Sequence, residues 1–542
     1  MQVLSAAERA RLAAYVTDLD APVFGLRNLP ETVMGALFAR YSRSEKGLRQ
    51  LLLEEFLQNP EAGPDTWARE PASHAAAAQV DAARAEAFYD RVLIGYGDDS
   101  VAELGGAHIA CEAISNVAAK VIEDSRIGLS PLEKSTRYVR FDQQVAGQYQ
   151  YLREPAIMAS RHAQRYVAAM DGLFSTYATL LPASLAYVRA RSPRDAVTSE
   201  RAYRSATRAK ALDLLRGLLP MATCTNVGLF GNGRAFEHLL NRLYASDLEE
   251  LRVLAGTMQR ALDALIPAFV KRPCTERGRA SQQYQRQTRA AVTALVAGLD
   301  LPAPPAAPVQ VGATLVAYDA DAELRVLAAI LYPETSLPLS ELWATVHTLD
   351  AATRAAIVRA YVGQREVRFH RPGRAFEEAR YTFDLVADLG AYRDLQRHRM
   401  LTQARQRYTT ALGFLVPAEI DDAGLGAPYR QALEQAAEAA TAIAAELPDA
   451  AGYAVPFAAL TRWRVTLNLR EAYHLCELRS SPQGHPGYRS IAQAMARAIQ
   501  AVHPLLAEGM RFVDQASYDL ERLAAEQRLD QKIAARSGGE NP

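Results

Sequence analysis

Apolar residues recur every three to four positions along much of the chain, which is the spacing of helices with one buried face. Clear examples are residues 201–270 and 427–447, which are rich in Ala, Leu, Arg and Glu. A shorter segment, ARYTFDLVADL at residues 379–389, is instead rich in β-forming residues and predicts a strand. The pattern therefore predicts an α+β protein in which helices dominate.

The helical pattern is interrupted by LDLPAPPAAPVQVGA, residues 299–313, which contains four prolines. Proline stops a preceding helix and resists burial in a core, so this segment is expected to be a linker. The predicted organisation is an N-terminal domain at 1–300, a Pro-rich linker at 301–312 and a C-terminal domain at 313–542.

Composition narrows the class of protein. Lys plus Arg equals Asp plus Glu, at 61 each, so no general basic excess suggests nucleic-acid or membrane-surface binding. The four cysteines are scattered without zinc-ligand spacing, which predicts reduced thiols and no metal site. No signal peptide and no run near eighteen apolar residues is present, so a cytoplasmic protein is expected.

Three short motifs of the first half are echoed, in the same order, in the second half. LRNLPETV at 26–33 resembles ILYPETSL at 330–337, and EKSTRYVRF at 133–141 resembles ARQRYTTAL at 404–412. GNGRAFEHLLNRL at 231–243 resembles LNLREAYHLCELR at 467–479. Any one echo is at chance level, but three in register predict a tandem duplication with extra residues in the N-terminal copy.

Arg397, His398 and Arg399 follow the predicted strand and a short helical segment. Guanidinium forks offer paired donors to phosphate or to a carbonyl-rich ring. Because consecutive helical residues fan out by about 100° each, the triplet would serve several neighbours. The alternative is a solvated helix face with arginines lying over apolar neighbours.

Two further polar clusters are candidates. Asn468 followed by Glu471 fits a variant of the capping box. Arg470 and His474 share a helix face, whereas Arg479, eleven residues after Asn468, lies nearly at the azimuth of Asn468, so the helix presents polar groups on two sides. Earlier in the chain, SPLEKSTRYVRF could form a phosphate cradle or an ordinary serine turn into a strand. The residues of this cradle are Glu133, Ser135, Thr136, Arg137 and Tyr138.

Taken together, these motifs resemble the flavin-dependent thymidylate synthase family, whose signature runs from RHR to S-x-R-Y and is completed by a distal N-x-R helix. YTFDLVADLGAYRDLQRHRM and LTRWRVTLNLREAYHLCELR resemble the approach to the signature and the distal helix. GYGDDSVAELGGAHIACEAISNV and LEKSTRYVRF resemble the family's earlier segment and the end of its signature. The resemblance implies two copies of the family's fold, arranged as a pseudo-dimer.

Each copy departs from the signature. The C-terminal copy keeps RHR but has Arg405-Gln406-Arg407-Tyr408 where the family has S-x-R-Y, and it lacks the expected Asn and Glu. The N-terminal copy keeps the S-x-R-Y motif but has no RHR. Since the family builds its sites between subunits of a homotetramer, these losses are complementary. They predict one composite site per chain and a homodimer that mimics the tetramer.

The activity that the resemblance implies is reductive methylation of dUMP to dTMP. The methyl donor would be methylenetetrahydrofolate, NADPH would be the reductant and FAD the cofactor, with no nucleic-acid or membrane partner. The implied catalytic residues are Arg397 and Arg479, and the implied substrate-binding residues are Glu133, Ser135, Thr136, Arg137, Arg397 and Arg479. The implied flavin-binding residues are Arg397, His398, Arg399, Asn468, Arg470 and His474, with Asn232, Arg234 and His238 of the N-terminal copy.

Two alternatives remain open. A catalytically decayed homologue would bind flavin or nucleotide without methylating. In a helical interaction protein, the arginine clusters would be no more than part of the protein surface. The ordered repeats and the spacing of the distal helix argue against this interpretation.

Overall fold

The computed structural model describes residues 4–42, 44–57, 102–302 and 309–537. Residues 95–101 of the family-like segment and 303–308 of the predicted linker lie outside them. The chain forms two compact units: residues 1–112, 127–133 and 226–302 form unit 1, and the remainder forms unit 2. Both compact units draw on the first 302 residues, so they do not coincide with the two sequential copies.

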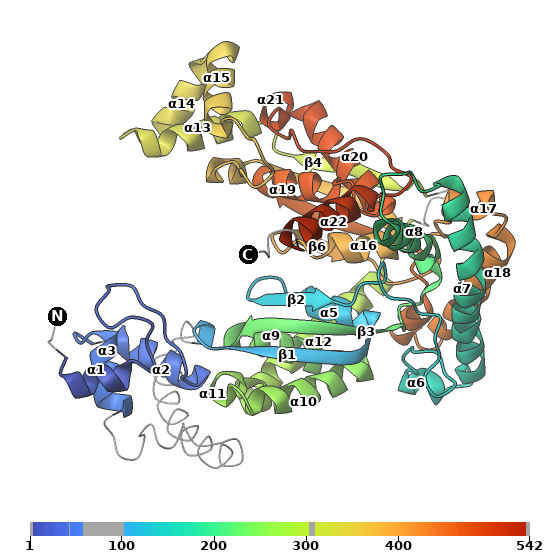
Figure 1. Cartoon of the computed structure of the whole chain (residues 1–542), viewed down its shortest axis with the longest axis horizontal. Coiled ribbons are helices and arrows are strands. Elements are labelled where there is room, and N and C mark those ends of the chain that lie inside the picture. The colour runs from blue at the N-terminus through green and yellow to red at the C-terminus, as the bar shows by residue number, and fades with distance from the viewer. Residues whose placement is uncertain (1–3, 43, 58–101, 303–308, 538–542) are drawn as a thin grey trace. The chain divides into compact units, whose positions relative to one another are not determined.

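Unit 1 contains the N-terminal helices, most of a small sheet and the helices that follow this sheet (Figure 1). Its elements are α1 (Ala6–Leu12), α2 (Glu31–Tyr41), α3 (Leu48–Leu51), η1 (Leu52–Leu57), β1 (Gly106–Ser115), β2 (Leu129–Glu133), β3 (Cys224–Asn232), α9 (Gly233–Tyr244), α10 (Glu249–Asp263), α11 (Pro267–Val270), η6 (Arg272–Cys274) and α12 (Glu276–Ala297). The last residues of β1 and the first of β3 belong to unit 2.

Unit 2 contains a second, larger sheet and the helices around it. Its elements before the linker are α5 (Asn116–Glu123), α6 (Pro155–Met158), α7 (Ala163–Arg191), α8 (Glu200–Leu215) and η5 (Arg216–Leu218). Those after it are β4 (Gly312–Tyr318), α13 (Ala322–Leu331), η7 (Tyr332–Glu334), α14 (Leu339–Thr348), α15 (Ala351–Val362), η8 (Arg374–Glu378), β5 (Arg380–Asp388), α16 (Leu389–Leu395), β6 (Thr402–Arg405), α17 (Ala418–Asp422), α18 (Gly426–Ala444), η9 (Ala450–Ala454), β7 (Leu460–Asn468), α19 (Leu469–Arg479), α20 (Pro486–Val502), α21 (Pro504–Ala507) and α22 (Leu523–Ser537).

The predicted α+β class is confirmed, with helices dominant and small antiparallel sheets. The predicted strand at 379–389 is β5, and the helix predicted at 427–447 is α18. The helical pattern at 201–270 is wrong for Cys224–Asn232, which forms β3. Buried and exposed residues alternate along this segment, as they do in a strand with one buried face. Its glycines also disfavour a helix, so the segment forms a strand. Within the described residues, no helix is both long and apolar enough to cross a membrane.

The two sheets repeat one topology. The strand order is β1-β3-β2 in one sheet and β4-β5-β7-β6 in the other, so β5, β7 and β6 match β1, β3 and β2. In both copies, the first and the central strand run directly into a helix whose N-cap is the last residue of the strand. These caps are Ser115, Asp388, Asn232 and Asn468.

Within unit 2 the copies meet around a local two-fold relation. Pro220 bridges Pro456, its equivalent in the second copy. The amide of Met221 donates to the carbonyl of Val455 at 2.8 Å, and the equivalent amide of Phe457 donates to the carbonyl of Leu219 at 2.8 Å. Reciprocal pairing of equivalent groups is the mark of an isologous interface. Next to it, α7 packs along α18 and α8 (Figure 1).

The register of the second sheet brings the RHR segment to the distal helix. Residues of β6 pair with β7 so that Thr402 lies opposite Thr466, close to the end of β7 where α19 begins. The turn at 397–400 directly precedes β6 and therefore lies next to the first turns of α19.

Helix α19 is fixed from its other side by a buried ion pair. Arg365 donates from Nη1 and Nη2 to the two carboxylate oxygens of Glu477, each at 2.6 Å, and both side chains are almost fully buried. A bidentate pair of this kind holds the helix in one position. Removing one partner would leave the other charge buried and unpaired.

Glu477→Gln should therefore lower the free energy of unfolding by about 3–5 kcal/mol. The matched control is Glu508→Gln, which removes the exposed pair with Arg359 and should cost about 1 kcal/mol or less. Urea-induced unfolding followed by circular dichroism measures both changes. Equal destabilisation by the two substitutions would contradict the structural role of the buried pair.

Candidate anion and cofactor site

The distal helix begins with a structural cap. Asn468 is the N-cap of α19, and its Oδ1 accepts a hydrogen bond from the amide of Glu471 at 2.9 Å. Asn232 caps α9 in the same way through the amide of Ala235 at 2.8 Å. The capping interpretation is thus confirmed for Asn468, and a cofactor contact by either asparagine stays a prediction.

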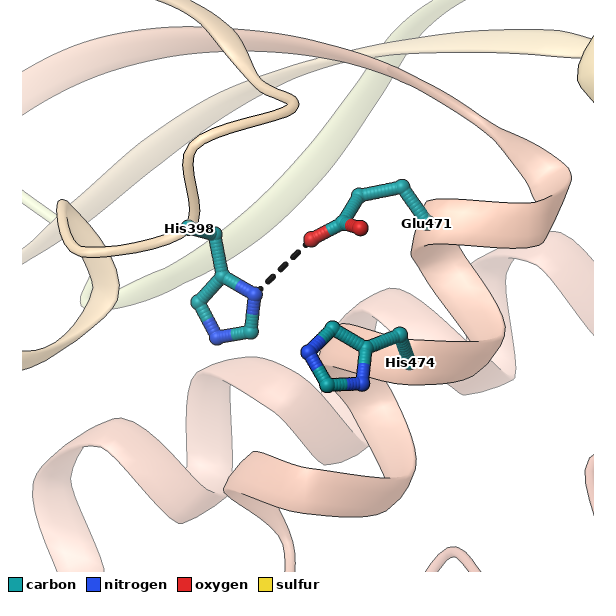
Figure 2. Close-up of side chains that lie close together, drawn as sticks. All are labelled: His398, Glu471 and His474. Carbon is teal, nitrogen blue, oxygen red and sulfur yellow. Dashed lines mark hydrogen bonds and ion pairs between the residues drawn. The ribbon is translucent and has the colours of Figure 1, made fainter. Parts of the chain in front are cut away.

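The central residue of RHR is held between the start and the end of α19. Figure 2 shows His398 reaching from its loop toward Glu471, which lies one turn before His474 on the helix. His398 Nδ1 is 2.8 Å from Glu471 Oε1, and Arg479 Nε donates to His398 Nε2 at 2.9 Å. Because Nε2 accepts, the imidazole proton resides on Nδ1 and is donated to Glu471.

Both imidazoles of this cluster are neutral near pH 7. Burial, and then the charge of Arg479, holds the pKa of His398 well below its ordinary value. Burial lowers the pKa of His474 to about 4, with Arg371 and Arg368 acting in the same direction and Glu471 against it. The two rings lie with their centroids 5.3 Å apart.

His398, Glu471 and His474 also place three possible metal ligands within 4.8 Å of one another. The surroundings disfavour a cation, however, because Nε2 of His398 already accepts from Arg479. The charges that act on Glu471 include those of Arg371, Arg470 and Arg479. An electropositive cluster with fixed neutral imidazoles suits an anionic or carbonyl-rich ligand better than a metal ion.

The first arginine of RHR faces carboxylates from both copies. Arg397 Nε lies 3.6 Å from Oε1 of Glu123, on α5, and Arg397 Nη2 lies 4.0 Å from Asp394. Glu123 is buried and also pairs with Lys120. Arg397 is therefore held at the boundary between the two copies within unit 2.

Asp394 lies at the centre of a group of guanidinium groups. Burial acts to raise the pKa of its carboxyl group, but nearby positive charges outweigh burial and hold the pKa far below its ordinary value. The charges responsible are those of Arg216, Arg397, Arg479 and Arg137. Arg216 donates to Asp394 at 3.3 Å, and its Nη2 is buried without a hydrogen-bond acceptor among the described residues.

The S-x-R segment forms a tight turn. Ser135 Oγ accepts from the amide of Arg137 at 3.3 Å, and the carbonyl of Ser135 accepts from the amides of Tyr138 and Val139. The predicted serine turn is confirmed, but it follows β2 and does not lead into a strand. Thr136 is buried within the turn, and Glu133 ends β2.

Arg137 is committed to protein acceptors. It donates to Asp213 from Nε at 2.8 Å and from Nη2 at 2.6 Å, and from Nη1 to the carbonyl of Gln483 at 3.1 Å. Burial opposes its charge, but Asp213 outweighs burial and raises the pKa of Arg137. Arg137 Nη1 and Arg479 both approach Tyr488, the former at 3.5 Å from its hydroxyl and the latter at 5.6 Å from its ring centroid.

The structure thus brings together Arg137, Arg397 and Arg479, which the sequence predicts as one composite site. Other predicted residues are placed differently. Arg470 donates to the carbonyl of Pro372 at 3.0 Å and pairs with Glu377, and Arg399 is exposed. Asn232, Arg234 and His238 belong to unit 1, where Arg234 pairs with Glu103 and His238 is exposed.

The residues around these cations were not predicted from the sequence. They are Glu123, Asp213, Asp394 and Tyr488, together with a further cation, Arg216. The buried Asp213 offers one usable signal, because it lies in a run of buried apolar residues at the C-terminal end of α8, between Leu212 and Leu214. A buried charged residue in such a run requires a partner.

The duplicated α+β copies thus meet around a buried cluster of arginines and neutral histidines. The family model of the thymidylate synthase complementing protein matches residues 58–268 and again residues 314–505. The chain belongs to this family and carries two copies of its domain.

Relatives extend over nearly the whole chain. A UPF0159 protein of Chlamydia muridarum is 43% identical over 523 residues, which cover 96% of this chain and 97% of the relative. The UPF0159 protein Ta1429 of Thermoplasma acidophilum is 33% identical over 527 residues, covering 92% and 98%. Among solved structures, the UMP/dUMP methylase PolB from Streptomyces cacaoi, bound with 5-Br dUMP, matches with 20% identity and a TM-score of 0.31, over 37% of this chain and 94% of that chain. That likeness is too low to define fold or function here.

The lowered pKa of His474 predicts a pH dependence of stability. The unfolded chain protonates this histidine below about pH 6.5, whereas the folded chain does so only near pH 4. The unfolded state therefore binds more protons between these values, and stability is lost as pH falls through this window. The melting temperature of the wild type should fall relative to that of His474→Asn from pH 6.5 to 4. Parallel melting profiles over this range would contradict the shift.

Proposed function

We propose that this chain is a flavin-dependent thymidylate synthase, which methylates dUMP to dTMP with methylenetetrahydrofolate, NADPH and FAD. Its site would be composite, with the S-x-R turn supplied by the N-terminal copy and RHR and the distal helix by the C-terminal copy. Family membership and the position of Arg137 beside Arg397 and Arg479 support the proposal.

The observation that carries the proposal is the excess of positive charge around Asp394. Arg137, Arg216, Arg397 and Arg479 all act on this one carboxylate, and the further carboxylates paired with these arginines are Asp213, Glu123 and Asp388. A nucleotide phosphate and the carbonyl oxygens of a pyrimidine are suitable partners for such a cluster.

The donor set around α19 fits a flavin. When bound, the flavin would supply the hydride chemistry. His398 and His474 would line it as neutral imidazoles, with Arg397, Arg399, Asn468 and Arg470 as the further contacts that the resemblance implies. The hydrogen bonds of His398 to Glu471 and Arg479 fix its ring in one orientation before any ligand arrives.

Arg479 and Arg397 would act on the pyrimidine. A guanidinium placed at a carbonyl oxygen stabilises negative charge as it develops there. Burial lowers the pKa of Arg479, but an arginine keeps its charge in proteins. Cys476, on the same helix, is buried and its pKa is raised by burial, so it is unsuited to act as a nucleophile.

The alternative is a decayed homologue that binds flavin or nucleotide without methylating. One observation favours it, since all three guanidinium nitrogens of Arg137 already have protein acceptors. In the C-terminal copy, the segment equivalent to S-x-R-Y has no serine, and Arg405 stacks 3.5 Å over the ring of Tyr408.

Flavin binding is the first test of both interpretations. The purified chain, or the chain mixed with FAD, should show the visible absorption bands of bound flavin. Oxidation of the reduced flavin by methylenetetrahydrofolate that depends on dUMP would then identify the synthase. Bound flavin without this oxidation would identify the decayed homologue. A protein that never acquires flavin bands would exclude the synthase and any homologue that binds flavin, and would leave only a homologue that binds nucleotide alone.

Substitution of arginines tests the composite site. Arg397→Ala should weaken dUMP binding about 10- to 100-fold, since it removes a charge-assisted contact. Arg405→Ala, the control, alters the equivalent turn of the degenerate motif and should change binding little. Isothermal titration calorimetry measures both affinities, and the reverse ranking would refute the composite site.

The predicted homodimer that mimics a tetramer is tested by the mass of the chain in solution. Light scattering coupled to gel filtration should give twice the 59.3 kDa of one chain. A monomeric mass would contradict the predicted homodimer.

A further inference from the structure

The C-terminal segment brings one more cation to the arginine cluster. Arg522 precedes α22 and is 9% exposed, yet Nε and Nη1 of its guanidinium have no hydrogen-bond partner among the described residues. The guanidinium lies over the aromatic ring of Tyr138, the last residue of S-x-R-Y. Arg522 Cζ is 4.0 Å from the centroid of this ring. The matched segment of the family model ends at residue 505, before this arginine.

The position of Arg522 is determined by the residue before it. Glu521 is buried and accepts from Lys210 Nζ on α8 at 2.9 Å, while Glu419 lies 3.1 Å from the same nitrogen. One turn further along α8, Asp213 holds Arg137. A single helix therefore anchors both Arg137 and the segment that carries Arg522.

Helix α22 reinforces this anchoring through polar contacts with α8. Glu526 accepts from Arg201 Nη1 at 2.8 Å and from the hydroxyl of Ser205 at 3.0 Å. Gln527 donates to Thr198 at 2.7 Å, just before the cap of α8. The segment is therefore docked on α8 from residue 521 to beyond residue 526, which makes the placement of Arg522 specific.

The charges around Arg522 do not neutralise it. Burial, followed by repulsion from Arg137, lowers the pKa of Arg522, whereas Asp213 acts in the opposite direction. The carboxylate of Asp213 is already engaged by Nε and Nη2 of Arg137. A buried guanidinium without an acceptor is costly unless a ligand supplies one.

We propose that Arg522 binds the phosphate of a nucleoside monophosphate, in concert with the S-x-R turn. Arg137, to which the family-like motif would give this role, acts as a positioning residue, because Asp213, Gln483 and Tyr488 engage its nitrogens. A phosphate would supply the charge-assisted hydrogen bonds that Nε and Nη1 of Arg522 lack among the described residues. The identity of the nucleoside rests on the proposed function, whereas the phosphate site does not.

The test compares Arg522→Gln with Arg528→Gln, a control on the exposed face of α22. Calorimetry on the full chain would measure binding of dUMP, of deoxyuridine and of inorganic phosphate. Arg522→Gln should weaken dUMP and phosphate about 10-fold or more and leave deoxyuridine unchanged. Arg528→Gln should leave all three affinities unchanged.

Melting temperatures without ligand separate ligand binding from a structural role. Removal of an unpaired buried charge should leave the melting temperature of Arg522→Gln equal to or above that of the wild type, whereas a structural arginine would lower it. Retained phosphate and dUMP affinity in Arg522→Gln would overturn the proposal. If the wild type binds phosphate through Arg522 but shows no preference for dUMP, the phosphate site stands and the proposed synthase function fails.

Discussion

Asp394 is the carboxylate on which the arrangement of the site depends. Four guanidinium groups act on it, and they come from α19, from the RHR turn, from the S-x-R turn and from η5 after α8. One carboxylate cannot neutralise four cations, and burial makes the remaining imbalance costly. Asp213, Glu123 and Asp388 each pair with one of these arginines and reduce the imbalance, and an anionic ligand would reduce it further.

The duplication explains how these groups reach one place. The reciprocal pairing around Pro220 and Pro456 relates the copies by a local two-fold within unit 2. A symmetric pair of identical copies would carry each motif twice. Here the N-terminal copy keeps S-x-R-Y and the C-terminal copy keeps RHR, so a chain that retains each motif once can still assemble one complete set. The C-terminal segment, beyond the matched family domain, then contributes a cation of its own.

Sequence analysis predicted the class of fold, the strand β5, the helix α18 and the duplication, because these follow from local periodicity and from motif order. It missed β3 inside a long helical stretch, since the two-residue alternation of TNVGLFGN is short beside the helices around it. It also predicted that Arg137, Arg397 and Arg479 lie together, and the structure places all three near Asp394. It could not identify Asp213, Asp394 or Arg522, because their significance comes from contacts between segments that are distant in sequence, such as that between Arg137 and Asp213.

The most direct measurement is a crystal structure of the full chain with dUMP and FAD. We expect one nucleotide whose phosphate contacts Arg522 and the turn at Ser135, and whose pyrimidine carbonyls contact Arg397 or Arg479. A nucleotide bound by residues of one copy alone, or away from the arginines around Asp394, would contradict the composite site.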